Sequence, residues 1–533
     1  MESLTTRLPD YPTIRLVAFA LALVAVAAIA AHRLPSILAF QAAMLRYPYP
    51  TQGSEGLIVY EASRLAHGQG IYVANTPGAH AFVSGPYTPL YFLAVALTLK
   101  LTPTVFAGGR AITFCAWLAL LALLGALVYQ TAERSRAVGQ SGSRAAEVRR
   151  QAADGGRQKD AGESATADSP IVYRLSSIVS VAAAVLLLAV FSPGVIWAVR
   201  VKPTIPALAL AAAGLLLVQR WRDSPRREWA LVFFVAAYFT KQTELAAPLA
   251  ATLFLLVNAG WRQAARFVGL GLLGGGAIFA ALDLATQNEF FRHTVGDRRL
   301  PWEPQLLWNF GTLFLRDYWP LLAAALCAAV ALALARAATV APYYLATALI
   351  FLPMIGVVGA DHDHLIELAT ACALAVGTAL AVLAGRRDAL AWTLVPVAAL
   401  LVALVATAWT PDRWYAGELN LPSPAEQDQL AKIVHNLRYT PGDALAEDVG
   451  LLVLAGKPVP YDDPQAMAAL SRAGRWDQAQ LLDDLAQQRF SLVLLPPNTR
   501  PELWTDQTLA AIHANYYLKF RDVWFTYEAN RLR

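Results

Sequence analysis

Long apolar segments recur along the chain and limit the possible folds more than any other feature. A helix that crosses a bilayer needs about 20 consecutive, mostly apolar residues. Segments close to this length lie at 14–31, 108–131, 173–191, 203–219, 228–240, 244–258, 264–284, 318–336, 341–359, 364–385 and 389–409. Because lipid offers no hydrogen bonds to the backbone, segments of this length cross it as helices. The sequence therefore predicts an all-α polytopic membrane protein with about eleven transmembrane helices.

The composition agrees with a membrane protein and argues against nucleic-acid binding. Only 15% of the 533 residues are charged, whereas a soluble domain has about 25%. The net charge of +5 comes from short basic clusters between apolar segments and does not form one basic face. The cysteines Cys115, Cys327 and Cys372 lie inside apolar segments, where we expect them to pack as small hydrophobic side chains.

The basic residues also predict the orientation of the chain. The loop 131–174 is rich in arginine, so it is expected on the cytoplasmic side. With a cytoplasmic N-terminus, an even number of crossings must precede this loop. The apolar segment 86–101 would make that number odd, so we expect it to lie in the membrane interface or to re-enter on the outer side. The chain is then a multi-pass protein of the cell (inner or plasma) membrane with an extracytoplasmic C-terminus.

Two domains are expected. Residues 1–409 form the membrane domain, with an outer loop at 32–107 that carries interfacial helices. The cytoplasmic loop 132–172 is rich in Gly, Ser, Ala and charge, which predicts disorder. Residues 410–533 read as a small extracytoplasmic α/β domain, because the capping box 423–426 starts a helix and the apolar run 491–495 is typical of a buried strand.

The first outer loop holds the most informative motifs. Glu55 lies just beyond the first apolar segment and is followed by a stretch with helical apolar spacing. Taken alone, this carboxylate could simply interact with the positive end of the helix dipole. The motifs that accompany it are Glu55-Gly56, the Gly-x-x-x-Tyr of 68–72, the stretch 85–93 that begins Gly-Pro-Tyr-Thr-Pro-Leu, and the Gly-Arg of 109–110.

Together these motifs resemble the membrane glycosyltransferases of the GT-C class. The resemblance is closest to glycosyltransferase family 39, the group of the protein O-mannosyltransferases and the lipid A aminoarabinose transferase, and it covers roughly 50–131. Two positions depart from the family pattern. Relatives often have Asp-Glu where this chain has Ser54-Glu55, and His-Pro-Pro-Leu where it has 87–90. These departures leave metal dependence and the acceptor open.

The resemblance implies an inverting transferase that takes a hexosyl or pentosyl group from a polyprenyl-phosphate donor at the outer leaflet. In the family, the acidic residue that matches Glu55 serves as general base or as a metal-linked carboxylate. The chemistry needs such a group, since an attacking hydroxyl or amine must lose a proton. A divalent cation is a possible cofactor, and Glu55, Asp361 and His362 are its possible ligands.

The phosphate of the donor needs cations on the outer side. The candidates are Lys241, Lys202 and Arg292, although any of them could instead extend its charge to the membrane interface. We expect Lys241 to bind the phosphate, because a cation between two short buried helices is costly without an anionic partner.

The turn 361–364 contains two carboxylates and two imidazoles, which could bind a divalent ion or orient a hydroxyl-rich substrate. It could equally be a polar turn that caps two helices. We expect substrate contacts from Asp361 and His364, and from Glu61 and Tyr87 of the first outer loop.

Two other functions remain open. A transporter or flippase for lipid or sugar would show two similar halves with charged groups near mid-membrane, whereas this chain has no evident repeat and its ionisable residues lie mostly at span ends. An assembly protein would use the tail 410–533 to bind partners. The sequence identifies neither the sugar nor the acceptor, which could be a glycan, a lipid or a protein.

Overall fold

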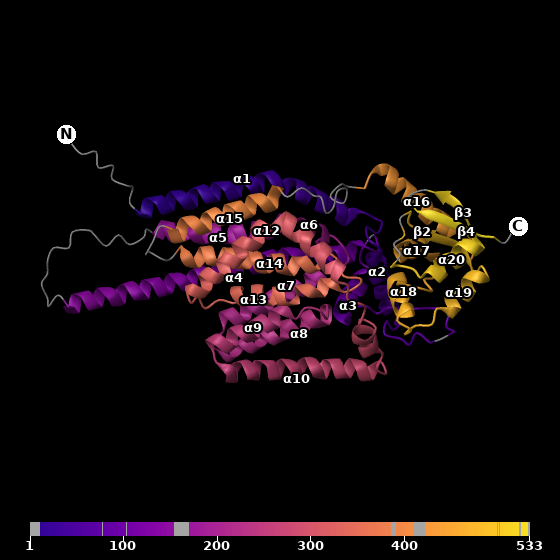
Figure 1. Cartoon of the computed structure of the whole chain (residues 1–533), viewed down its shortest axis with the longest axis horizontal. Coiled ribbons are helices and arrows are strands. Elements are labelled where there is room, and N and C mark those ends of the chain that lie inside the picture. Colours follow the sequence, from indigo (N-terminus) through magenta and orange to yellow (C-terminus); the bar gives the residue numbers. More distant parts are fainter. Residues whose placement is uncertain are drawn as a thin grey trace.

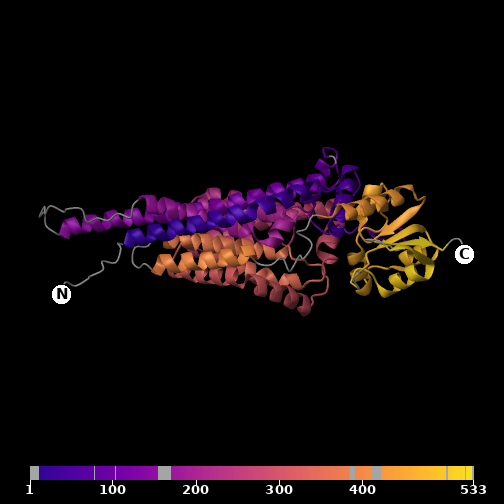
Figure 2. The same ribbon diagram turned by 90° about the horizontal axis from the view of Figure 1, so that it is seen from above.

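The computed structural model of the chain describes residues 11–76, 78–102, 104–153, 170–384, 391–409, 422–497, 499, 502–521 and 524–530. Long helices run side by side in an elongated bundle, and a small α/β unit sits at one end of it (Figure 1). The same arrangement is seen after a quarter turn (Figure 2). The C-terminal unit is therefore an end cap of the bundle.

All the apolar segments predicted to cross the membrane are helical. Six helices are long and apolar enough to span by themselves: α1 (Tyr11–Arg46), α4 (Ala107–Ala153), α5 (Pro170–Ala189), α10 (Trp261–Ala285), α12 (Pro304–Leu334) and α14 (His364–Leu383). Shorter apolar helices form the rest: α7 (Thr204–Arg220), α8 (Ala230–Thr240), α9 (Ala246–Asn258), α13 (Ala341–Phe351) and α15 (Ala391–Trp409). The predicted polytopic all-α membrane fold with a small α/β domain is confirmed.

Helix α14 is the centre of the bundle, and α10 is at its edge (Figure 1). Of the most apolar stretch of α14, 89% is buried, against 6% of that of α10. Small side chains allow neighbouring helices to approach α14 closely: a Cβ on Gly377 would lie 2.6 Å from the Cβ of Ala184 in α5. The polar residues that begin α14 are thus held by a rigid scaffold.

The turns between helices separate into two groups. Arginine-rich turns gather at one end, where Arg134 donates to the carbonyl of Arg220 (2.9 Å) and Arg227 bonds Gln263. At the end next to the C-terminal unit, here called the distal end, Gln52 donates to Asp361 (2.8 Å). Alternate turns of a multi-pass chain must lie at opposite ends of the bundle. The separation of the basic turns from the distal turns therefore agrees with the crossings predicted from the sequence.

The segment 86–101 forms the short helix α3 (Pro89–Thr98). Ten residues rise only about 15 Å, half the thickness of the hydrocarbon core. Helix α3 packs against α2 (Gly53–Ala66), α4 and α8. Its length agrees with a segment that does not cross, and its position in the membrane interface stays a prediction.

The expected disorder of 132–172 is wrong for its first half. Helix α4 continues to Ala153, well beyond the apolar segment, and α5 begins at Pro170. Alanine, arginine, glutamate and glutamine in this stretch have high helix propensity, which favours continuation of the helix. Residues 154–169 lie outside the described part of the chain.

The C-terminal unit is the expected α/β domain. Its four-stranded sheet has the order β1-β2-β4-β3, with β1 parallel to β2 and the other pairs antiparallel. The capping box of Ser423 and Glu426 forms as predicted. The elements are α16 (Pro424–Tyr439), β1 (Asp443–Ala446), α17 (Val449–Ala455), α18 (Pro464–Arg472), α19 (Ala479–Ala486), β2 (Phe490–Leu495), α20 (Asp506–Asn515), β3 (Tyr516–Arg521) and β4 (Phe525–Ala529).

This unit is bound to the first outer loop through backbone contacts. Helix α17 packs directly on α2, where a Cβ on Gly56 would lie 2.2 Å from the backbone nitrogen of Gly450. The amide of Phe82 donates to the carbonyl of Pro460 (2.7 Å). Helix α2 is therefore held between the bundle and the C-terminal unit, and it carries Glu55 and Glu61.

Candidate functional site

Glu55 lies at the centre of a buried hydrogen-bond network at the distal end. Its side chain is 0% exposed. Arg110, at the start of α4, binds both carboxylate oxygens, at 3.0 Å from Nε and 2.8 Å from Nη2. The amide of Val201 donates to Oε1 at 2.8 Å, and the amide and hydroxyl of Thr51 donate to Oε2, each at 2.8 Å. Five donors therefore occupy the two oxygens of this carboxylate.

Arg110 is equally constrained. It is also 0% exposed, and it donates to the carbonyls of Met44, Tyr47 and Tyr49 at the end of α1. The pair thus connects the end of α1, helix α2, the start of α4 and the turn before α7.

This environment does not suit the predicted role of Glu55 as general base. Burial alone would raise the pKa of Glu55, but the charge and hydrogen bonds of Arg110 outweigh the burial and hold the pKa at about 2. A carboxylate so strongly stabilised as an anion is a weak proton acceptor. In this structure Glu55 is a fixed anion that positions the backbone around it.

Lys202 follows the backbone that Glu55 holds. It lies between α6 (Ser192–Trp197) and α7, and only 8% of it is exposed. Its Nζ donates to Oη of Tyr87 at 3.1 Å and lies 5.6 Å and 5.5 Å from the ring centres of Tyr87 and Trp197. Among the described residues, Lys202 forms no ion pair with a carboxylate. A buried ammonium with aromatic and hydroxyl neighbours remains able to bind an anion.

Lys241, at the end of α8, is engaged differently. Its Nζ lies 3.0 Å from Oδ2 of Asp363 and donates to the hydroxyl of Thr204 at 2.8 Å. Thr204 in turn donates to Asp363. The anionic partner that a buried lysine requires is therefore supplied by the chain itself, which weakens the case for Lys241 as the first phosphate ligand.

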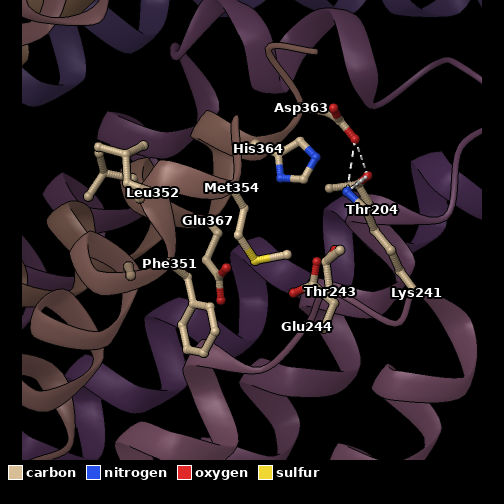
Figure 3. A pocket seen from close by; sticks show the side chains of 12 residues that line it. Thr204, Lys241, Thr243, Glu244, Phe351, Leu352, Met354, Asp363, His364 and Glu367 are labelled. Carbon is tan, nitrogen blue, oxygen red and sulfur yellow. Dashed lines mark hydrogen bonds and ion pairs between the residues drawn. The ribbon is translucent and has the colours of Figure 1, made fainter. Parts of the chain in front are cut away.

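A narrow pocket opens beside this ion pair (Figure 3). Its side chains lie close together, and the enclosed space between them is large enough for about one water molecule. Polar side chains converge on it from the start of α7, the turn between α8 and α9, and the start of α14. The lining residues are Thr204, Lys241, Thr243, Glu244, Ala348, Phe351, Leu352, Met354, Asp363, His364, Glu367 and Leu368.

Two of the remaining predicted residues border this pocket region. Asp361 accepts from Gln52 of the first outer loop and from His362. His364 lines the pocket itself. Glu55, Asp361 and His362 are not arranged as ligands of one ion, and the described residues contain no group of three His, Cys, Asp or Glu side chains placed to hold a metal.

Arg292 lies apart from the pocket, in the π-helical turn Arg292–Gly296. It pairs with Glu289 at 3.3 Å and with Asp297 at 3.7 Å, and about a third of its side chain is exposed. Gln242 lies between the nearby turn and the pocket region, and it donates to the carbonyls of Pro86 and Thr294. Arg292 is thus a member of a local ion-pair group.

Glu61 faces the C-terminal unit and does not line the pocket. It accepts from the amide of Gly85 at 2.6 Å. Burial raises the pKa of Glu61 to about 8, and it raises the pKa of Asp462 well above its ordinary value. Asp462 accepts from the amide of Ser84 at 3.0 Å. One proton between the Glu61 and Asp462 carboxyl groups would satisfy both, and this group ties the first outer loop to the C-terminal unit.

The structure also brings forward residues to which sequence reasoning gave no role. Glu244 and Glu367 both line the pocket. The only signal for Glu244 was an acidic residue at the start of a short apolar segment, where burial of a charge is costly. Glu367 stands one helical turn after the 361–364 motif, so it shares a face with Asp363.

Comparison with known proteins supports the fold. No protein-family model matches the chain, and no curated protein matches it in sequence. A crystal structure of ArnT from Cupriavidus metallidurans in the apo state matches with a TM-score of 0.52 at 11% identity, covering 92% of this chain and 96% of that chain. The structure of the same protein bound to undecaprenyl phosphate matches with a TM-score of 0.55 at 12% identity, covering 93% and 96%. The likeness extends over nearly the whole chain, so the chain shares the fold of ArnT.

Proposed function

We propose that this chain is a glycosyltransferase that moves a sugar from a polyprenyl-phosphate donor to an acceptor on the outer face of the membrane, with inversion. The observation that carries the proposal is the contact of Lys202 with Tyr87 at the distal end, where Lys202 lies two residues before Thr204 of the pocket. It supports the proposal because the fold is shared with ArnT, of which one structure holds undecaprenyl phosphate. A lipid phosphate is the leaving group that such a transferase releases.

Lys202 is the first candidate for the donor phosphate. Its ammonium and the Tyr87 hydroxyl lie 3.1 Å apart, so both can donate to oxygens of one phosphate. Positive charge at this point stabilises the phosphate as it leaves the anomeric carbon. Lys241 adds positive charge nearby, but its bond to Asp363 assigns it mainly to fixing the turn between α8 and α9. Arg292 is the weakest of the three candidates.

Glu55 has a positioning role in this proposal. The amide of Val201 donates to Glu55, and Lys202 is the next residue. Asp361 is connected to the same loop through Gln52. The first outer loop thus fixes the positions of Lys202 and the 361–364 turn, and it does so without contact between Glu55 and the reacting atoms.

Binding of undecaprenyl phosphate to the purified protein in lipid nanodiscs tests the phosphate site, with native mass spectrometry as the measurement. We expect Lys202→Ala to weaken binding about tenfold or more, because a hydrogen bond to a charged group contributes about 1.5–3 kcal/mol. Lys100→Ala is the matched control, since Lys100 is an exposed lysine of the first outer loop. Equal affinity for the wild type and Lys202→Ala would contradict this assignment.

Transfer itself is tested with radiolabelled hexosyl and pentosyl polyprenyl phosphates and a membrane lipid extract as acceptor. We expect the wild type to form a labelled product whose anomeric configuration is opposite to that of the donor. Binding of the lipid phosphate without transfer from any donor would contradict the proposed activity.

A further inference from the structure

Two carboxylates in the pocket have no role in holding the donor phosphate. Glu244 lies just before α9, and Glu367 lies in the first turn of α14. Together with Asp363 they give the pocket three carboxylates, while Lys241 is the one lysine or arginine that lines it. Lys241 is already paired with Asp363 at 3.0 Å. Glu244 and Glu367 therefore lack a dedicated cation.

The hydrogen bonding of these carboxylates is incomplete, in contrast to that of Glu55. Only 4% of Glu244 is exposed, yet its Oε2 is buried without a hydrogen-bond partner in the described structure. Glu367 accepts one long bond, from Oη of Tyr344 at 3.4 Å. Both side chains reach into the pocket, on either side of Met354 (Figure 3). No donor among the described residues therefore occupies the lone pairs of Glu244 Oε2.

Two carboxylates in a poorly solvated pocket do not both stay ionised without a cation, so such a pair holds one proton between them. The ionised member can then accept a second proton from a group that enters the pocket. Glu55, which is saturated by five donors, has no such capacity. An attacking hydroxyl or amine still has to lose its proton somewhere.

We propose that Glu244 and Glu367 form the proton-accepting pair of the transfer reaction, with the ionised member as general base. This inference rests on the proposed function. The nucleophilic oxygen or nitrogen of the acceptor forms a bond to the anomeric carbon, and the bond from that carbon to the phosphate oxygen breaks. The electron pair of that bond leaves with the polyprenyl phosphate. The proton of the nucleophile passes to the carboxylate pair.

The other titratable groups around the pair favour this division of roles. Lys241 and Asp363 face it from α8 and α14 as a closed ion pair, His364 faces it from α14, and Tyr344 faces it from α13. Thr204 and Thr243 contribute only neutral hydroxyls. Of the carboxylates in the pocket, Glu244 and Glu367 are thus the ones left to change protonation.

The shared proton can be measured without any substrate. Infrared difference spectra of the full-length protein in nanodiscs, recorded during a pH titration, report the C=O stretch of protonated carboxyl groups. We expect a band that disappears in both Glu244→Gln and Glu367→Gln and persists in Glu303→Gln, an exposed control. If neither variant changes the carboxyl bands, the pair does not exist and the inference is overturned, whatever the outcome of the transfer assay.

Transfer kinetics then test the catalytic role. We expect Glu244→Gln and Glu367→Gln each to lower kcat about 100-fold, to alter the pH profile of kcat, and to bind undecaprenyl phosphate as the wild type does. Glu244→Asp should recover part of the rate, because it restores the carboxylate. Wild-type kcat in both Gln variants overturns the inference. If the wild type binds the lipid but transfers no sugar, the proposed function is overturned instead. The infrared titration needs no substrate, so it tests the carboxylate pair in that case as well.

Discussion

Glu55 and Arg110 form an ion pair that is fully buried at the distal end of the bundle. Removal of one partner from such a pair leaves an uncompensated buried charge, which costs about 3–5 kcal/mol. We expect Glu55→Gln to lower the unfolding temperature of the detergent-solubilised protein clearly, whereas Glu303→Gln should leave it unchanged. Differential scanning fluorimetry measures both. An unchanged unfolding temperature with lost turnover would instead support Glu55 as the general base.

The pH dependence of this pair has a defined sign. The pKa of Glu55 is about 2 in the folded protein, below its ordinary value of 4.5. The ion pair therefore contributes its full stabilisation above about pH 4.5 and loses it as the pH falls toward 2.

Glu61 has the opposite pH dependence. Its pKa is raised from 4.5 to about 8 by burial. The contribution of Glu61 to folding stability is therefore fully present below about pH 4.5 and is lost as the pH rises toward 8. We expect hydrogen exchange at the amide of Ser84, which donates to Asp462 across the interface, to become faster over this range. Glu61→Gln should remove this pH dependence, after correction for intrinsic exchange. Protection that increases with pH would contradict the assignment.

At the scale of elements, the contact between α2 and α17 determines how the C-terminal unit sits on the bundle. A Cβ on Gly56 would lie 2.2 Å from the backbone of Gly450, which is too close for either helix to stay in place. We expect Gly56→Ala to destabilise the protein by about 1–3 kcal/mol. Gly53→Ala is the matched control on the same helix, because its Cβ would meet nothing closer than 4.0 Å. Equal unfolding temperatures for the two variants would contradict this account.

The sequence predicted the helices and strands better than it predicted the side-chain contacts of the site. The apolar segments and the capping box gave the helices closely, since burial and local hydrogen bonding decide them. From the sequence, Lys241 ranked above Lys202 as the ligand of the donor phosphate. The sequence did not show that Asp363 is the partner of Lys241. Those residues are 122 positions apart, so their contact depends on how α8 and α14 pack. The continuation of α4 to Ala153 shows that helix propensity can override a composition typical of disorder.

At the scale of the whole molecule, the separation of basic turns from the distal end predicts the orientation in the membrane. In a variant with Cys115, Cys327 and Cys372 replaced by alanine, a cysteine at Asp506 should react with a membrane-impermeant maleimide in intact cells. A cysteine at Arg226 should react only after the membrane is permeabilised, because the basic turns are expected inside. The reverse labelling pattern would contradict the predicted orientation.

The sequence by itself determined that this chain is a helical membrane protein with an α/β tail, and its first-loop motifs resemble those of the GT-C transferases. Those properties follow from local hydropathy, capping and charge, which are written along the chain. Only the tertiary structure decided that Glu55 is saturated by Arg110 and that Glu244 meets Glu367 in one pocket. Whether a carboxylate is a fixed anion or a free acceptor depends on its burial and its donors, and these come from segments far apart in the sequence.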